Sequence, residues 1–401
     1  MMRRGSVLIA AAAAMILAGP ALSQEISIKI GVMNDRSGTY ADLSGEGSVV
    51  AARMAAEDFG AEEKGIKVEF VSADHQNKPD IGSNIARQWY DEDGVDVIVD
   101  VPTSSVALAV NEVTREKDKV FLVSGAAASD LTGAQCSPNT IHWTYDTWAL
   151  AHGTGRAMVE QGGDTWFFLT ADYAFGHALE RDTAAVVEEA GGKVLGAVRH
   201  PFPGQDFSSF LLQAQGSGAK VIGLANAGAD TTNSIKQARE FGITQAGQSL
   251  AGLLIFITDV HALGLETAQG LVLTESFYWD LSDDTREWSK RFAEAHNGNM
   301  PTMVHAGVYS AVLHYLKAVE ALGSKESDAV VSKMKEMPTE DPLFGKGEVR
   351  QDGRKIHDLY LFRVKSPDQS TGPWDYYETL ATIPADQAFR PMEEGGCPLV
   401  Q

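Results

Sequence analysis

The sequence predicts an α/β fold in which helices cover two separate sheets of the parallel type. Three observations lead to this prediction. Runs with β-strand composition alternate with amphipathic helical patterns along most of the chain. Several runs, such as 97–99 and 166–169, are continuously apolar, which is typical of strands buried on both faces of a parallel sheet. The 401 residues, 44% of them hydrophobic and 22% charged, are enough for two domains of ordinary size.

The expected strands fall into two series. The first series comprises residues 28–33, 67–72, 96–101 and 119–124. The second series comprises residues 165–170, 193–198, 220–225 and 271–276. A polar and aromatic stretch over 142–148 lies between them, so we expect the chain to leave one sheet there and to begin the next.

Helical patterns separate the strands. The first helix is indicated by Val49, Ala52, Ala56 and Phe59, which recur at helical spacing. Another amphipathic helix is expected over 106–117, where Ser104 or Ser105 can cap the free N–H groups of the first turn. The remaining helices are expected at residues 80–92, 149–161, 176–190, 207–215, 231–241, 285–296, 304–322 and 328–337.

The C-terminal part departs from this alternation. Residues 346–350 and 357–364 flank a turn signal at Asp352-Gly353, and the pattern predicts a β-hairpin. From Lys365 onward the chain is rich in Pro, Gly and polar residues, so we expect this tail to wrap the surface.

The N-terminus has the features of an export signal. Arg3 and Arg4 precede an apolar, Ala-rich run over 7–17, and small residues follow over 21–23. This order predicts a cleaved secretory signal peptide over residues 1–23. No later stretch approaches the roughly 18 consecutive apolar residues typical of a membrane-spanning helix. We therefore expect an exported protein.

Charge and cysteine usage narrow the partners and the compartment. The formal net charge of −21 repels nucleic acid and anionic lipid surfaces. It does not exclude an anionic ligand, because salt screens the field beyond about 8–10 Å. The two cysteines, Cys136 and Cys397, form an even pair in an exported chain, which indicates a disulfide between the tail and the first domain. The alternative is two free thiols.

Motifs for catalysis, metal binding and cofactor binding were not found. The sequence has no Gly-x-Ser-x-Gly elbow, no His-Glu-x-x-His, no Walker A motif and no Gly-x-Gly-x-x-Gly after a strand. The ten histidines are scattered; His296 and His305, for example, have no ligand partner at metal-site spacing. We therefore expect a protein that is not an enzyme, with no catalytic residues, metal or cofactor.

Seven short segments, none of them diagnostic alone, together carry a resemblance to a known family. They are residues 30–38, 45–56, Val101-Pro102-Thr103-Ser104-Ser105, 122–127, Asp172-Tyr173-Ala174-Phe175-Gly176, 205–210 and 235–242. In this order and spacing, the chain resembles the type I periplasmic solute-binding proteins of ABC importers, the leucine/isoleucine/valine-binding family. The resemblance covers nearly the whole chain after the signal peptide.

The resemblance implies an architecture and a cellular role. Two Rossmann-like lobes with parallel-type sheets would be joined by a three-stranded hinge and would close on a small-molecule ligand. The first lobe would hold 24–144 and 277–344, and the second would hold 145–276 and 345–364. The tail, 365–401, would pack back on the lobes. The protein would be a periplasmic monomer that needs no cofactor, binds no nucleic acid and delivers its ligand to the permease of an ABC importer.

The resemblance also implies which residues bind the ligand. Ser104, Ser105 and the loop containing Ala127 and Ser129 match the positions that hold the ligand's carboxylate. Free N–H groups at the start of a helix can bind a carboxylate without a cationic side chain. The other positions expected to face the ligand are Tyr40, Leu43, Tyr145, Tyr173, Phe175, Asn226, Phe277, Tyr278 and Trp279.

One departure from the family pattern bears on the ligand. Members that bind amino acids supply an acidic group where this chain has the apolar stretch 251–254. Asp259 or Asp230 could replace that group if the alignment shifts. A buried ammonium without a partner costs several kcal/mol, so the sequence favours a small organic carboxylate with an apolar or aromatic body. The alternatives are a branched-chain or other aliphatic amino acid, a sensory domain that presents its ligand to a receptor, and a secreted enzyme.

Overall fold

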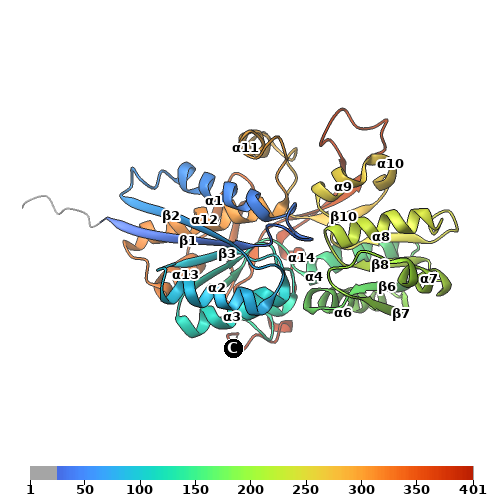
Figure 1. The fold of residues 1–401 in the computed structure, drawn as a ribbon, viewed down its shortest axis with the longest axis horizontal. Coiled ribbons are helices and arrows are strands. Elements are labelled where there is room, and N and C mark those ends of the chain that lie inside the picture. The colour runs from blue at the N-terminus through green and yellow to red at the C-terminus, as the bar shows by residue number, and fades with distance from the viewer. Residues whose placement is uncertain (1–24, 401) are drawn as a thin grey trace, which may run out of the picture.

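The protein is described by a computed structural model that places residues 25–400. The expected signal peptide, residues 1–23, lies outside the described residues. Two α/β lobes lie side by side, one around strands β1–β4 and the other around strands β6–β8 (Figure 1). No helix between residues 25 and 400 has the length and apolar character needed to cross a membrane.

The first sheet has five parallel strands in the order β2-β1-β3-β4-β5. Its strands are β1 (Ile26–Asn34), β2 (Ile66–Asp74), β3 (Val97–Asp100), β4 (Val120–Val123) and β5 (Thr140–His142). Buried side chains alternate between its two faces: Val97 and Val99 belong to one core cluster, and Ile98 belongs to another. Both faces are therefore covered, as the continuous apolar runs predict.

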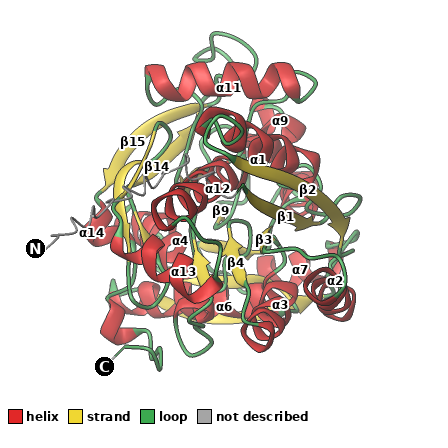
Figure 2. Ribbon diagram, turned by 90° about the vertical axis from the view of Figure 1, so that its left-hand side faces the viewer, coloured by secondary structure: helices red, strands yellow, loops and turns green. Residues whose placement is uncertain are grey.

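Helices form the layers on either side of this sheet (Figure 2). Helices α1 (Gly45–Phe59) and α12 (Met303–Leu322) pack together on one face. Helices α2 (Pro79–Asp91) and α3 (Ser104–Lys117) pack together on the other. Helix α11 (Asp283–Ala295) contacts α1, and helix α13 (Ser327–Glu336) packs on α12.

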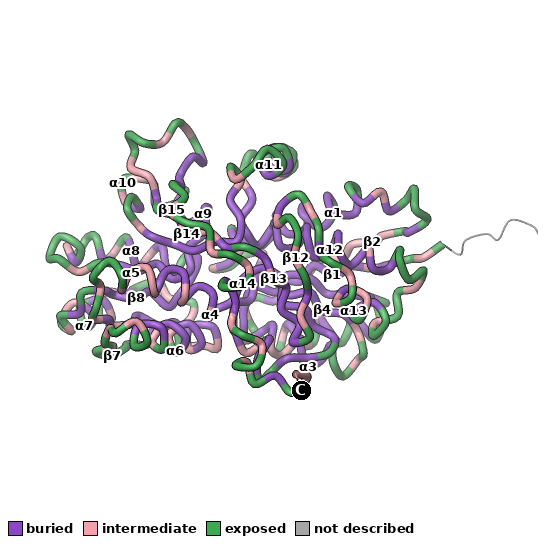
Figure 3. The backbone as a smooth tube through the Cα atoms, turned by 180° about the vertical axis from the view of Figure 1, so that it is seen from behind, coloured by how far each residue is buried: buried purple, intermediate pink, exposed green. Residues whose placement is uncertain are grey.

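The second sheet has four parallel strands in the order β7-β6-β8-β9. They are β6 (Thr165–Ala171), β7 (Lys193–His200), β8 (Val221–Ala225) and β9 (Ser249–Gly252). Its helices are α6 (Ala174–Glu189), α7 (Ser208–Gly216), α8 (Ala229–Glu240), α9 (Ile257–Leu263) and α10 (Leu265–Ala268). Buried segments follow the strands of both sheets, and the outer loops are exposed (Figure 3).

The predicted helices are present within about two residues of their expected ends, with one irregularity. The region 149–161 contains α4 (Thr147–Leu150), a π-helical turn (Ala151–Gly155) and α5 (Arg156–Glu160). Its start lies earlier than expected because the Asp146 carboxylate accepts a hydrogen bond of 2.9 Å from the N–H of Ala149.

The predicted hairpin has the correct turn and the wrong partner. The turn closes with a 3.0 Å hydrogen bond from the Gly353 N–H to the Arg350 carbonyl. However, β12 (Gly345–Val349) pairs only with the short β13 (Lys355–Ile356) and with β11 (Thr339–Asp341).

The other half of the expected hairpin, β14 (Leu359–Val364), belongs to a separate antiparallel sheet. It lies between β10 (Val272–Glu275) and β15 (Tyr377–Ile383). Burial explains the difference, because Phe362 packs among the aromatic rings of the second lobe. Strand β12 also contacts α13.

The C-terminal tail is more regular than a surface wrap. It forms β15, then α14 (Ala385–Ala388), and returns to the first lobe. There, Cys397 is joined to Cys136 by a disulfide with a Cα–Cα distance of 5.7 Å, which confirms the predicted pair. The division into lobes at residues 144 and 276 stays a proposal.

Candidate ligand-binding site

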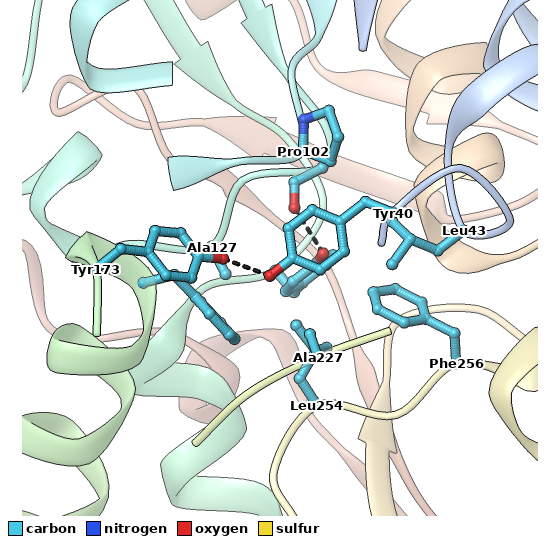
Figure 4. Close-up of a pocket in the computed structure, with 11 residues that line it drawn as sticks. Tyr40, Leu43, Pro102, Ala127, Tyr173, Ala227, Leu254 and Phe256 are labelled. Atoms are coloured by element: carbon cyan, nitrogen blue, oxygen red, sulfur yellow. Dashed lines mark hydrogen bonds between the residues drawn. The ribbon is translucent and has the colours of Figure 1, made fainter. Parts of the chain in front are cut away.

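A small cavity lies where the two sheets face each other (Figure 4). Every residue that lines it follows the carboxyl end of a parallel strand. The loops after β1, β3, β4 and β5 contribute Tyr40, Leu43, Pro102, Gly125, Ala127 and Tyr145. The loops after β6, β8 and β9 contribute Tyr173, Phe175, Ala227, Leu254 and Phe256.

Strand order explains why these loops leave room for a ligand. In the first sheet, β1 lies between β2 and β3, so the loops after β1 and β3 run to opposite faces. In the second sheet, β6 occupies the same position between β7 and β8. Open α/β sheets bind ligands at such reversals of strand order. The cavity therefore joins the two positions at which each sheet by itself favours binding.

A pair of tyrosines connects the two sides of the cavity. The hydroxyl groups of Tyr40 and Tyr173 form a hydrogen bond with each other. The ring of Phe202 supports both, with centroid distances of 5.3 Å to Tyr40 and 4.2 Å to Tyr173. Burial is the main cause that raises the pKa of both phenols above its usual value, so both are neutral at pH 7.

The loop that carries Tyr40 is held in place by a buried carboxylate. Asp35 accepts hydrogen bonds from the N–H groups of Gly38 (2.7 Å) and Tyr40 (2.8 Å). The same loop reaches the second lobe, where the Ala229 N–H donates to the Thr39 carbonyl at 3.3 Å. The loop after β1 therefore contacts both lobes beside the cavity.

Tyr145 forms another wall of the cavity. Its hydroxyl donates a 2.6 Å hydrogen bond to the carbonyl of Gly125, and its ring meets Phe256 edge to face at 6.1 Å between centroids. Its own carbonyl accepts from the buried guanidinium of Arg354 at 3.2 Å. These three contacts fix the ring without using a group from the ligand.

Ser104 lies directly behind the cavity wall. Its hydroxyl oxygen accepts from the N–H groups of Ala127 (3.3 Å) and Ala128 (3.2 Å). The predicted capping role for Ser104 or Ser105 is wrong, because α3 already begins at Ser104 and Thr103 occupies the N-cap position. The Ser104 side chain instead ties the start of α3 to the loop after β4.

Among residues 25–400, no charged side chain lines the cavity. The nearby buried carboxyl groups have partners elsewhere: Asp230 accepts from the Gly204 N–H at 3.0 Å, and Asp259 accepts from the Phe256 N–H at 2.9 Å. Burial raises the pKa of each of these two carboxyls to about 7. Neither aspartate that could have replaced the missing acidic group therefore faces a ligand.

Asp100 is a third buried carboxyl near the cavity, and it lies behind the wall formed by Pro102 and Gly125. It accepts from the Ser44 hydroxyl at 2.7 Å and from the Asn34 amide at 3.0 Å. Burial raises its pKa to about 6. Its role in the described structure is to join the ends of β1 and β3.

The structure brings six of the thirteen predicted site residues to the cavity wall. They are Tyr40, Leu43, Ala127, Tyr145, Tyr173 and Phe175. Ser104 lies behind Ala127, and Ser105 is partly exposed on α3 and does not line the cavity.

Two predicted polar residues lie in other hydrogen-bond networks. The Ser129 hydroxyl donates to the Asp182 carboxylate of α6 at 2.7 Å. The Asn226 amide donates to Ser234 at 3.1 Å, and its oxygen accepts from Thr231 at 2.7 Å. Because these contacts already satisfy both side chains, neither is placed to bind a ligand in the cavity.

The three predicted aromatic residues after β10 also lie away from the cavity. Phe277 packs edge to face against Trp288 at 5.9 Å. The Tyr278 hydroxyl and the Trp279 indole N–H both donate to the carbonyl of Trp374, at 3.1 and 2.7 Å. These rings are therefore core and tail contacts.

Sequence reasoning missed five lining residues: Pro102, Gly125, Ala227, Leu254 and Phe256. Pro102 and Gly125 belong to segments that carry the family resemblance. Their positions directly after predicted strands could therefore have identified them as lining residues. Leu254 lies in the stretch 251–254, which the resemblance placed where relatives supply an acidic group, but it was not counted among the site residues. Phe256 lies farther along the same loop, after β9, a four-residue strand that was not predicted.

A family model described as periplasmic binding protein matches residues 27–372. The chain belongs to the periplasmic binding protein family. Three solved structures are similar to it. A periplasmic binding protein from Burkholderia mallei is 54% identical, covers 94% of this chain and 99% of its own, and has a TM-score of 0.91.

The second similar structure is a branched chain amino acid ABC transporter periplasmic ligand-binding protein from Burkholderia xenovorans LB400. It is 41% identical, with coverage of 93% and 100% and a TM-score of 0.82. The third is an ABC transporter solute binding protein from R. palustris in complex with benzoate. It is 21% identical, with coverage of 93% and 99% and a TM-score of 0.81, and it shows the shared fold. These comparisons confirm the predicted family and the two-lobed α/β architecture.

Proposed function

We propose that this periplasmic binding protein captures a small organic carboxylate, with aromatic acids as the first candidates, and delivers it to an ABC importer. The protein acts by binding alone and performs no reaction. Export through residues 1–23 puts it in the periplasm, where it works as a monomer and docks on the importer's permease. The similarity to two ABC transporter binding proteins supports the transport role.

The observation that carries the ligand class is an aromatic and apolar cavity without a charged side chain. A carboxylate can be held by N–H groups and hydroxyls, as at the junction of Ser104 and Ala127 near the start of α3. The ammonium of an amino acid needs an acidic partner, and leaving it unpaired costs several kcal/mol.

A branched-chain or other aliphatic amino acid is the second candidate. It is favoured by the description of the 41% identical relative from Burkholderia xenovorans as a branched chain amino acid binder. Asp100, Asp230 and Asp259 would then have to reach the ammonium by a rearrangement of their loops.

A ligand screen tests the proposal. We expect benzoate-type acids to raise the melting temperature of the purified protein and to bind in isothermal titration calorimetry. Combining Ser104→Ala with Ala127→Leu should abolish binding and leave the fold intact, whereas Ser105→Ala should bind like the original protein. Stabilisation by leucine or valine and by no aromatic acid would overturn the proposed ligand class.

A further inference from the structure

The cavity contains few polar side-chain atoms, and most of them are already paired. Within the part of the chain that the structure describes, only Tyr40, Tyr145 and Tyr173 bring a polar side chain to its wall. The Tyr145 hydroxyl donates to Gly125, and the Tyr40 and Tyr173 hydroxyls bond to each other. Recognition of polar groups on a ligand by the lining side chains therefore depends on the hydrogen-bonding capacity that the Tyr40 and Tyr173 hydroxyls have left.

The Tyr40 and Tyr173 hydroxyls have two O–H donors between them, and the hydrogen bond that joins them uses only one. Each neutral phenol brings one O–H donor and acceptor lone pairs. Among the described residues neither hydroxyl has another hydrogen-bond partner, so one O–H donor and several lone pairs are unused. A buried donor without a partner costs about 1–3 kcal/mol. A ligand that satisfies this donor gains that energy back.

The surroundings of the pair favour a neutral group over an anionic one. Asp230, at the start of α8, is 1% exposed, and its charge is among the causes, after burial, that raise the pKa of both phenols. A ligand carboxylate at the pair would add a negative charge near Asp230, whose pKa burial already raises to about 7, and a bare C–H would leave the O–H unpaired. A hydroxyl avoids both costs, because it accepts the unused proton and donates its own to a lone pair.

We propose that the Tyr40–Tyr173 hydroxyl pair determines specificity and selects ring-hydroxylated aromatic acids over unsubstituted ones. This inference rests on the proposed function, since it concerns which aromatic acid the same cavity prefers. A site that hydrogen-bonds a ligand hydroxyl discriminates strongly against the analogue that lacks it, because the buried groups of the site are then unpaired.

Calorimetry with benzoate and its three monohydroxylated isomers tests the inference on the original protein, Tyr40→Phe, Tyr173→Phe and Tyr145→Phe. We expect at least one hydroxylated isomer to bind the original protein tenfold or more tightly than benzoate, a difference of about 1.4 kcal/mol. Both pair variants should reduce that ratio below threefold. The control Tyr145→Phe removes a cavity hydroxyl outside the pair and should keep the ratio.

The ratio of the affinity for a hydroxylated isomer to the affinity for benzoate separates an effect on specificity from an effect on lobe closure. Breaking the bond between the lobes changes the open–closed equilibrium by one factor for all four acids, so it cancels in the ratio. A ratio near one in the original protein, or an unchanged ratio in both pair variants, overturns the inference and leaves the proposed function standing. Failure of all four acids to bind overturns the proposed function as well.

Discussion

At the scale of single residues, the contact between the lobes depends on a glycine. Gly228, after β8, has a φ of +58°, and a Cβ added to it would lie 2.5 Å from the Thr39 carbonyl oxygen and 3.0 Å from the ring of Tyr40. Thr39 and Tyr40 belong to the opposite side of the cavity. A side chain at 228 would therefore hold the two sides apart at the point where they meet.

Gly228→Ala should weaken ligand binding by tenfold or more, because the added methyl group obstructs closure on the ligand. The control is Gly218→Ala, in the same lobe, where φ is +67° and nothing lies within 4 Å of an added Cβ. Both variants carry the backbone strain of a left-handed residue, about 1–2 kcal/mol, so their melting temperatures should fall similarly. Equal affinities in the two variants, measured by calorimetry, would contradict the steric explanation.

Five of the six predicted residues that lie on the cavity wall come after a strand that the sequence also predicted, and the sixth, Tyr145, follows the unpredicted three-residue strand β5. Tyr40 follows β1 and Tyr173 follows β6, and both reach the cavity. Asn226 also follows such a strand, but its amide turns toward Thr231 and Ser234 in its own lobe. The apolar pattern of a strand shows where the following loop lies. The direction of a side chain in that loop depends on the hydrogen-bond partners around it in the folded lobe.

At the scale of elements, pairing between distant strands was the least predictable feature. The turn at Gly353 is a local signal and was read correctly. The choice of β10 and β15 as partners of β14 depends on burying Phe362 beside Tyr278 and Tyr377, contacts that span 84 and 15 residues of sequence. Strand β9 reads Ser-Leu-Ala-Gly and therefore lacks the apolar run that identifies the equally short β3 and β4.

Helix α6, in the second lobe, is hydrogen-bonded to the first lobe through the carboxylate of Asp182. Asp182, on α6, accepts from the hydroxyls of Ser129 (2.7 Å) and Thr147 (2.6 Å), and Arg181 binds its other oxygen at 2.9 Å. Ser129 belongs to the short 3₁₀ helix Ser129–Thr132, after β4 of the first sheet. The network therefore joins an element of one lobe to an element of the other.

Asp182→Ala should destabilise the protein by about 2–4 kcal/mol, since two hydroxyls lose a buried, charged acceptor. Chemical denaturation followed by circular dichroism measures the loss. Glu188→Ala is the matched control, because Glu188 is exposed on the same helix and should change stability by no more than about 0.5 kcal/mol. Similar stabilities for the two variants would mean that the network contributes nothing.

At the scale of the whole molecule, the region between the lobes contains buried charge. The segments 142–146 and 354–357 run side by side there, with a bridge between His142 and Arg354. Arg354 and Lys355 are both fully buried. Arg354 lies 3.5 Å from the Asp146 carboxylate, but the Lys355 ammonium has no hydrogen-bond partner among the described residues.

The neighbours of Lys355 stabilise its buried ammonium only in part. Its ammonium lies 4.1 Å from the ring centroid of Phe344 and 5.3 Å from that of Trp143. Burial lowers its pKa to about 7, with Asp341 opposing this shift and Arg354 adding to it. A folded-state pKa below the ordinary 10.5 means that folding favours the neutral amine. The resulting loss of folding free energy is largest below pH 7 and disappears as the pH rises toward 10.5.

Lys355→Met should therefore stabilise the protein by roughly 1–4 kcal/mol at pH 7, since an apolar side chain of similar size avoids burying the charge. This gain in stability should shrink steadily between pH 7 and pH 10. The reason is that removing the proton from the lysine of the unfolded original protein costs less free energy as the pH approaches 10.5. Denaturation curves across this range measure the difference. Lys346→Met, at a lysine that is 82% exposed on β12, should show no such trend. A gain that does not vary with pH, or a loss at every pH, would contradict a neutral, buried amine at Lys355.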